Sequence, residues 1–238
     1  MVRLFIVFLI SITVEINSSA YATNLLNNPG FETFEDYVGP WPSTYGTWKG
    51  DISEVVGPDN GVVPFDSGML KFVNTRWGLG YPNGQSGDLV QLINLAPYFP
   101  LVTTGAARVR FSAHFNRVTD SGAGTVDTAF SVRLFARSDA FRNFADNVPS
   151  SLAFNEALLT SNNDPSTWEL ASGVLDIPAD ATYLAIMLRV TENVVNDTTN
   201  EFAGHYADNV MVSFVPEPSS LLLLGLSVVG SMGRRTRS

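Results

Sequence analysis

The chain of 238 residues contains no cysteine and only two histidines. The lack of cysteine excludes disulfides, thiolate metal sites and a cysteine nucleophile. His114 and His205 lie in strand-like segments without a Gly-x-Ser-x-Gly elbow, a His-Glu-x-x-His motif, a phosphate-binding loop or a dinucleotide fingerprint. A pair of Asp or Glu carboxylates, as in a glycosidase, is the remaining catalytic alternative. Exposure in loops is the simpler interpretation of the acidic residues in this chain. The sequence therefore predicts a protein that is not an enzyme.

Basic residues are scarce, with 14 Lys and Arg against 23 Asp and Glu and a net charge of −9. This balance argues against a nucleic-acid partner. It suits solubility and cation binding, although a solvated acidic surface is the simpler explanation for most of the carboxylates.

The composition favours strands and turns. Hydrophobic residues make up 45% of the chain, which excludes wholesale disorder, and 19 Gly, 13 Pro and 16 Phe disfavour long helices. Segments with period-2 or β-rich character alternate with turn clusters such as residues 57–61, and no repeat or linker interrupts residues 23–215. We predict one all-β sandwich with strands near residues 68–73, 88–95, 107–115, 128–136, 167–177, 182–190 and 205–215.

The alternation within these strands predicts which side chains enter the core. Residues 111, 113 and 115 share one face, as do residues 130, 132 and 134. Trp48 and Trp168 stand in apolar strand patterns and are predicted to be core residues. Residues 137–160 are too long for a hairpin, so we expect an elaborated loop with a short helical turn near residues 154–159.

The first 22 residues have the features of a secretory signal. Arg3 supplies a positive start, residues 4–14 are apolar, and Ala20-Tyr21-Ala22 fits a signal peptidase site. About 11 apolar residues are too few to cross a membrane, which needs roughly 20. The mature chain is thus expected to begin at Thr23.

The C-terminal residues 216–238 have the features of a second targeting signal. Pro216-Glu217-Pro218 precedes an apolar run over residues 221–232 and a basic cluster over residues 234–237. The arginines favour the cytoplasmic side and place the domain outside the membrane. As a helix the run spans only about 18 Å, so it suits a short transmembrane helix in a processing signal better than a permanent anchor.

This three-part tail resembles the PEP-CTERM sorting signal of Gram-negative bacteria. The resemblance implies transient membrane insertion through the C-terminal helix and processing by an exosortase, a membrane protease-transpeptidase, near Pro216-Glu217-Pro218. Before processing the protein would be membrane-anchored, and afterwards it would lie at the cell surface or in the extracellular space. Hosts of this system usually make an exopolysaccharide or biofilm matrix.

Residues 24–32 and 206–212, with Trp48 beginning the next strand, resemble the opening and closing segments of the galactose-binding-like jelly roll found in many carbohydrate-binding modules. Residues 167–169, 173–178 and 183–184 fit its later strands. The resemblance covers most of residues 24–215 and implies a jelly-roll β-sandwich.

In that family a structural calcium ion commonly joins the first and last strands. The resemblance implies carboxylate ligands at Glu32 and Asp208, a carbonyl ligand at Gly30 and a further carboxylate at Asp66. The residue types suit Ca²⁺, which takes six to eight oxygen ligands. The alternative is that Glu32 is a solvated strand end and Asp208 an Asx-turn residue.

Sugar-binding sites need flat aromatic faces together with a few polar groups. Trp41, Tyr45, Trp77 and Tyr81 stand among Gly, Pro, Asn and Ser, as binding-loop residues do. The alternative for each is ordinary packing over a sheet end. We expect an exported, non-catalytic surface or matrix protein that binds carbohydrate such as an exopolysaccharide, or a structural surface protein without sugar binding.

Overall fold

A computed structural model describes residues 23–37, 39, 41–73, 86–118, 128–138, 151–162, 164–191 and 204–215. Thr23–Val215 form one compact unit. A 3-10 turn, η2 (Ala96–Tyr98), and a short helix, α1 (Phe99–Val102), follow the fourth strand. The described strands are β1 (Trp48–Gly50), β2 (Ser53–Val56), β3 (Met69–Phe72), β4 (Ser86–Asn94), β5 (Arg108–Arg117), β6 (Ala129–Arg137), β7 (Ala153–Thr160), β8 (Glu169–Asp176), β9 (Tyr183–Thr191) and β10 (His205–Phe214).

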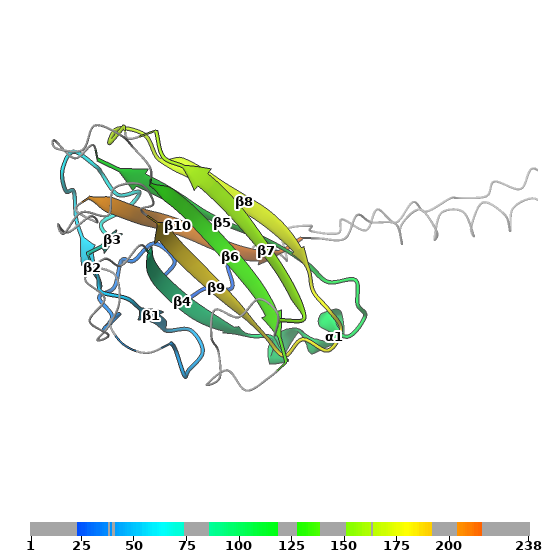
Figure 1. The fold of residues 1–238 in the computed structure, drawn as a ribbon. Coiled ribbons are helices and arrows are strands. Elements are labelled where there is room, and N and C mark those ends of the chain that lie inside the picture. The colour runs from blue at the N-terminus through cyan, green and yellow to red at the C-terminus, as the bar shows by residue number, and fades with distance from the viewer. Residues whose placement is uncertain are drawn as a thin grey trace, which may run out of the picture. The chain divides into compact units, whose positions relative to one another are not determined.

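The strands form two five-stranded sheets that pack face to face (Figure 1). Sheet A has the order β1-β4-β9-β6-β7, and sheet B has the order β2-β3-β10-β5-β8. Every pair of named strands is antiparallel. This arrangement confirms the predicted all-β jelly-roll sandwich.

The core lies between the inner faces of the two sheets. The residues predicted to share a face in β5 (Phe111, Ala113, Phe115) and in β6 (Phe130, Val132, Leu134) are all fully buried there. Phe115 and Phe130 stack across the sandwich with ring centroids 4.8 Å apart. Trp48 is also fully buried, as predicted. The period-2 pattern thus gave the correct inward face of both strands.

The N-terminal segment lies beside β10 in the middle of sheet B. The Leu25 N–H donates to the Val212 carbonyl at 2.8 Å. The Asn24 side chain donates to the Val210 carbonyl and accepts from the Val212 N–H. These bonds hold the first and last described segments of the domain side by side.

The seven predicted strands correspond to β3, β4, β5, β6, β8, β9 and β10. The helical turn predicted near residues 154–159 is wrong, because this segment is β7 and pairs with β6 along its whole length. Its Glu, Ala and Leu residues favour a helix in isolation. Pairing with β6 and the packing of Ala153, Ala157 and Leu159 on the core override that preference.

Each sheet also carries an apolar cluster on its outer face. On sheet A the cluster contains Val90, Leu92, Phe135, Tyr183, Ala185 and Met187. On sheet B the segment between β2 and β3 folds over Met69 and Tyr206, and Val62 completes this cluster. The prediction that Trp168 is a core residue is wrong, because Trp168 packs partly buried on this second outer cluster.

In the described part of the chain, none of the helices has the length and hydrophobicity needed to span a membrane.

Candidate functional site

The opening turn of the domain meets β10 at an acidic cluster. Asn28 and Phe31 have positive φ angles of 46° and 56°, and the Pro29 carbonyl between them accepts from the Val210 N–H at 2.9 Å. The position that a Cβ would take on Gly30 lies 3.5 Å from Glu32 Oε1 and 3.7 Å from Asp208 Oδ1. The structure therefore brings together three of the four residues predicted to bind calcium.

The two carboxylates hold the segment that leads into β3. Phe65 N–H donates to Asp208 Oδ2 at 2.9 Å, and the Asn209 N–H donates to Oδ1 at 2.6 Å. Glu32 accepts from the N–H and hydroxyl of Ser67 and from the Gly68 N–H. Burial alone would raise the pKa of Glu32, but these hydrogen bonds outweigh it and leave the pKa lowered.

Asp208 is buried with 1% of its surface exposed. Burial raises its pKa to about 6, the two backbone hydrogen bonds oppose the rise, and the negative charges of Glu32 and Asp66 add to it. Among the described residues, no ion pair with Lys, Arg or His involves any of these three carboxylates. An ionised Asp208 therefore lacks a positive partner within that part of the chain.

The donor set is made of oxygen atoms, which suits Ca²⁺. Within the described segments, no group of three or more His, Cys, Asp or Glu side chains is close enough together to hold a metal ion. A calcium ion here would thus use Glu32 and Asp208 with backbone carbonyls from the turn around Gly30. Asp66 is exposed and acts on Asp208 through its charge.

A pocket of about 200 Å³ opens beside the end of β4, next to the outer face of sheet A. Tyr45, Tyr98, Asn27 and Asn94 belong to its lining. Tyr45 is 38% exposed and joins the edge of β4 through a bridge to Leu92. We call this feature the Tyr45–Tyr98 pocket; it combines aromatic rings with amide groups, as sugar sites do.

Packing from behind fixes the walls of the Tyr45–Tyr98 pocket. The Tyr45 ring lies 6.5 Å from Tyr183, and the Tyr98 ring lies 5.0 Å from Phe214. The buried Gln91 side chain exchanges two hydrogen bonds of 2.9 Å with the backbone of Asn27. Both aromatic walls are therefore held in place without a ligand.

Gly46 is required at this pocket. It has a φ of +75°, and a Cβ at this position would collide with the amide of the Asn27 side chain. A larger residue at position 46 would displace that amide from the pocket wall.

Trp41 lies on the same side of the sandwich and packs, partly buried, against the outer cluster of sheet A. Two of the four aromatic residues predicted to bind sugar, Trp41 and Tyr45, thus adjoin one cluster. The other two, Trp77 and Tyr81, lie outside the described residues, as do the sorting residues Pro216, Glu217 and Pro218. Tyr98 was not among the residues predicted to bind sugar. The signal that could have indicated it is its position after Ala96-Pro97 at the end of a strand.

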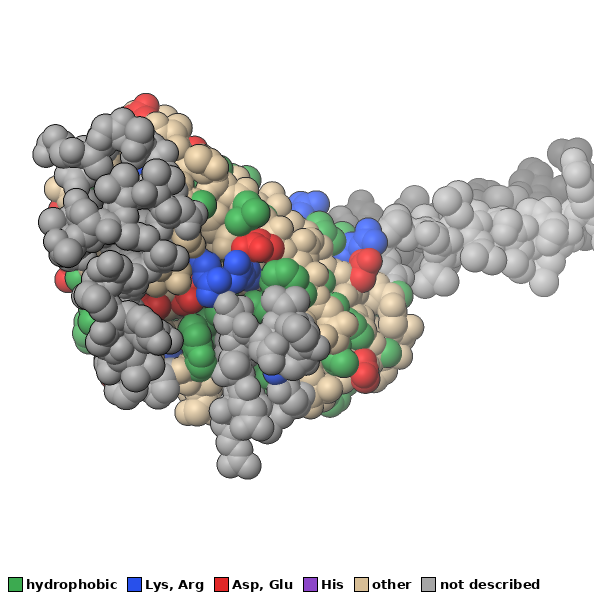
Figure 2. All heavy atoms as spheres, in the orientation of Figure 1, with side chains coloured by type: hydrophobic (Ala, Val, Ile, Leu, Met, Phe, Trp, Pro, Cys, Tyr) green, Lys and Arg blue, Asp and Glu red, His purple; other side chains and the backbone are tan. Residues whose placement is uncertain are grey.

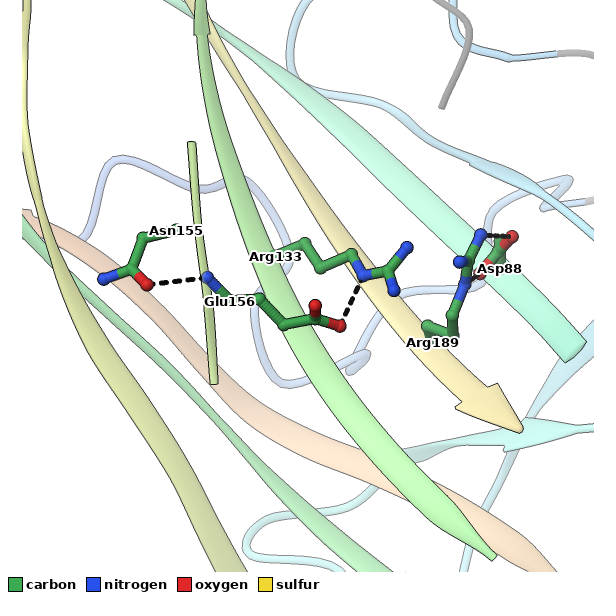
Figure 3. Close-up of polar contacts among 5 residues, drawn as sticks. All are labelled: Asp88, Arg133, Asn155, Glu156 and Arg189. Atoms are coloured by element: carbon green, nitrogen blue, oxygen red, sulfur yellow. Dashed lines mark hydrogen bonds and ion pairs between the residues drawn. The ribbon is translucent and has the colours of Figure 1, made fainter. Parts of the chain in front are cut away.

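Charged pairs cross the outer face of sheet A. Arg189 of β9 forms two bonds to Asp88 of β4, Nε–Oδ1 at 2.5 Å and Nη2–Oδ2 at 2.6 Å. Arg133 Nε contacts Glu156 Oε1 at 2.6 Å across β6 and β7, and the Asn155 side chain accepts from the Glu156 N–H (Figure 3). Figure 2 shows basic and acidic side chains gathered among hydrophobic ones on one face of the molecule.

Both histidines lie in strands of sheet B, His114 in β5 and His205 in β10. His205 Nε2 lies 3.1 Å from the Thr128 hydroxyl. His114 is the ladder partner of Asp208 in β5, and burial lowers its pKa.

Comparison with known proteins identifies a sorting motif at the C-terminal end of the chain. Residues 214–238 match the PEP-CTERM protein-sorting motif. The chain therefore carries a signal for export and surface sorting of the kind used by Gram-negative bacteria and processed by exosortase. The search of curated proteins gave no match.

Several similar solved structures are carbohydrate-binding modules. TmCBM61 in complex with β-1,4-galactotriose is 16% identical, with a TM-score of 0.42, covering 80% of this chain and 97% of that one. The CBM22-1 xylan-binding domain of Paenibacillus barcinonensis Xyn10C is 9% identical, with a TM-score of 0.39 and coverages of 75% and 92%. A Stig cyclase from Fischerella sp. TAU is 16% identical, with a TM-score of 0.45 and coverages of 84% and 100%. At these similarities, function has to be argued from the residues of this chain.

Proposed function

We propose that this protein is a non-catalytic surface protein that binds carbohydrate, such as an exopolysaccharide, through the Tyr45–Tyr98 pocket and the adjoining outer face of sheet A. The sorting motif at residues 214–238 supports the location outside the cell. The observation that carries the binding proposal is the pocket itself, whose lining contains two partly exposed aromatic residues held by other aromatic residues, together with two asparagines.

The chemistry of the pocket fits a sugar ring. Aromatic faces stack on the C–H groups of a pyranose, and amides donate to and accept from its hydroxyls. Asn94 Oδ1 already accepts from the Ala96 N–H at 2.9 Å, so its orientation is fixed and its Nδ2 group is directed away from that bond. Trp41 extends the apolar surface along the outer cluster of sheet A.

Binding of the exported protein to a panel of polysaccharides, measured by pull-down and by isothermal titration with their oligosaccharides, tests this proposal. We expect Tyr98→Ala and Tyr45→Ala to weaken binding at least about tenfold, since each removes one stacking face. Phe34→Ala is the matched control, because Phe34 is 77% exposed and lies outside the pocket lining. Unchanged affinity in both tyrosine variants would refute the pocket, and no binding to any polysaccharide would favour a structural surface protein.

We also propose that the acidic cluster of Glu32 and Asp208 binds a structural calcium ion with backbone carbonyls near Gly30. The support is the buried carboxylate without a cationic partner in the described chain, next to a second carboxylate. Calcium would neutralise the repulsion and tie the opening turn to β10.

A chelator titration with melting-temperature readout tests the calcium proposal. We expect chelation to lower the melting temperature of the exported protein, and Glu32→Ala and Asp208→Ala to remove this sensitivity. The control is Asp36→Asn, whose carboxylate is paired with Lys49 at the surface. A melting temperature that does not respond to chelator or to added calcium would exclude the site.

A further inference from the structure

The chain enters and leaves the domain at the same end of the sandwich. The Leu25 N–H donates to the Val212 carbonyl at 2.8 Å. Further along, the Pro29 carbonyl accepts from the Val210 N–H at 2.9 Å, so the opening segment runs antiparallel to β10. The N–H of Val215, the last described residue, donates to the first residue of β5 at 2.8 Å. The first described residues therefore lie beside the last ones.

The same end of the sandwich carries a segment without charged side chains. Residues 96–107 comprise η2, α1 and the link to β5, and contain no Asp, Glu, Lys or Arg. Helix α1 lies at one tip of the sandwich (Figure 1). The Tyr98 ring lies 5.0 Å from the ring of Phe214, the last residue of β10, which places the segment where the chain leaves the domain. We call residues 96–107 the end segment.

The end segment is held on one side and exposed on the other. Val102 is fully buried, and Tyr98 and Leu101 pack, partly buried, against the core. Phe99 is 39% exposed, and Pro100 beside it is exposed as well. Uncharged aromatic and aliphatic side chains are the groups that enter the interfacial layer of a bilayer.

The charges next to the end segment do not attract an anionic surface. Arg108 follows the segment directly and is paired with Asp176 at 2.6 Å. Asp180 is exposed in the neighbouring turn. Contact of this end with a membrane would therefore come from apolar side chains and not from basic residues.

The length of the chain beyond the domain limits how far this end can lie from a membrane. The apolar run over residues 221–232 begins six residues after Val215. Six Cα–Cα steps span at most about 22 Å. The headgroup layer outside the hydrocarbon core is about 5–8 Å thick. With the run inserted in a bilayer, Val215 thus lies within roughly 17 Å of the headgroup surface.

We infer that the end segment rests on the lipid surface while the apolar run is inserted, with Phe99 in the headgroup layer. The inference rests on insertion of that run and is independent of carbohydrate binding. A bilayer is the partner because the short connection brings it to this end of every unprocessed chain. A single lipid chain binds membranes only weakly, so a few exposed apolar side chains do not hold the domain there once processing removes the run.

Site-specific fluorescence tests this inference, because a chain without cysteine can carry one introduced cysteine as the only labelling site. Ala106→Cys places the fluorophore in the end segment. Thr160→Cys is the control, since Thr160 is exposed and level with the first residue of β4, whereas the end segment follows the last residue of β4. The nine residues of β4 separate these two levels by roughly 30 Å.

The unprocessed full-length chain, purified from cells that lack exosortase, is inserted into vesicles of phosphatidylcholine and phosphatidylglycerol that contain a nitroxide on the headgroup. We expect quenching at position 106 to exceed that at position 160 at least about threefold, because of the separation along β4. Phe99→Asp should reduce this difference by at least about half, since anionic lipid repels the carboxylate. Phe99→Leu should retain it, and Phe34→Asp, at an exposed residue outside the end segment, should not change it.

Three results would overturn the inference. Failure of the full-length chain to float with the vesicles removes the insertion on which it rests. Equal quenching at positions 106 and 160, with disulfide cross-linking of the Ala106→Cys chains to each other, assigns the end segment to a second copy. Stronger quenching at position 106 that Phe99→Asp leaves unchanged shows that the connection alone holds the domain near the lipid. Unchanged melting temperatures of the variants verify that they fold.

Discussion

Replacing Asp208 with Asn should make the stability of the calcium-free protein less dependent on pH. The carboxyl is raised from a pKa of 3.8 to about 6 in the folded state. Because the folded state binds this proton more tightly than the unfolded chain, the contribution of Asp208 to the free energy of unfolding is greatest below about pH 4. It is lost as the pH rises through about 6.

The size of the effect follows from the shift. About two pH units correspond to at most about 3 kcal/mol, and we expect about 2 kcal/mol because Glu32, one source of the repulsion, is screened by solvent. Asn resembles the protonated carboxyl, since either form weakens one of the bonds from Phe65 and Asn209. Asp208→Asn should therefore equal the wild type near pH 4 and be more stable at pH 7.

Urea unfolding at several pH values in the presence of a chelator measures this difference. Other carboxylates titrate in the same range, so the informative quantity is the difference between the variant and the wild type at each pH. Asp36→Asn serves as the control and should shift the free energy of unfolding by less than about 0.5 kcal/mol, because the Asp36 side chain is 80% exposed. A difference for Asp208→Asn that stays constant from pH 4 to pH 7 would refute the reasoning.

Two further predictions concern the sheets. Gly173→Ala should lower the free energy of unfolding by about 1–3 kcal/mol, because the new Cβ would lie 2.5 Å from the Phe111 ring, whereas Gly57→Ala has room and should change little in the same urea experiment. Arg189→Met should cost about 2–3 kcal/mol in thermal or urea unfolding, since it removes the two Arg189 bonds to the mostly buried Asp88 carboxylate. Arg108→Met breaks an exposed pair and should cost much less than Arg189→Met, and equal losses in the two arginine variants would contradict this ranking.

The sequence predicted most strands because one face of each had to be buried, so alternation along the chain revealed it. It failed at β7, an edge strand whose Glu, Ala and Leu residues favour a helix. Only the partner strand β6 decides the conformation there, and pairing between distant segments leaves no local signal.

The candidate sites show the same limit. Gly30, Glu32 and Asp208 could be proposed together because the chain resembles a family in which a calcium ion joins the first and last strands, and the structure brings these residues together. Tyr98 was missed because it stands in the segment Ala96-Pro97-Tyr98-Phe99, where an apolar residue has no periodic pattern. Trp168 was misassigned because an aromatic residue beside a strand looks the same from the sequence whether it packs inside or outside the sandwich.

The position of β10 affects how the domain withstands pulling. This strand is the last of the domain and lies in the middle of sheet B, bonded to β3 on one side and β5 on the other. Its hydrogen bonds run across the strand, so a force applied at Val215 along the strand loads many of them at once in shear instead of opening them one by one. Breaking β10 out of sheet B by such a pull therefore requires many hydrogen bonds to fail together.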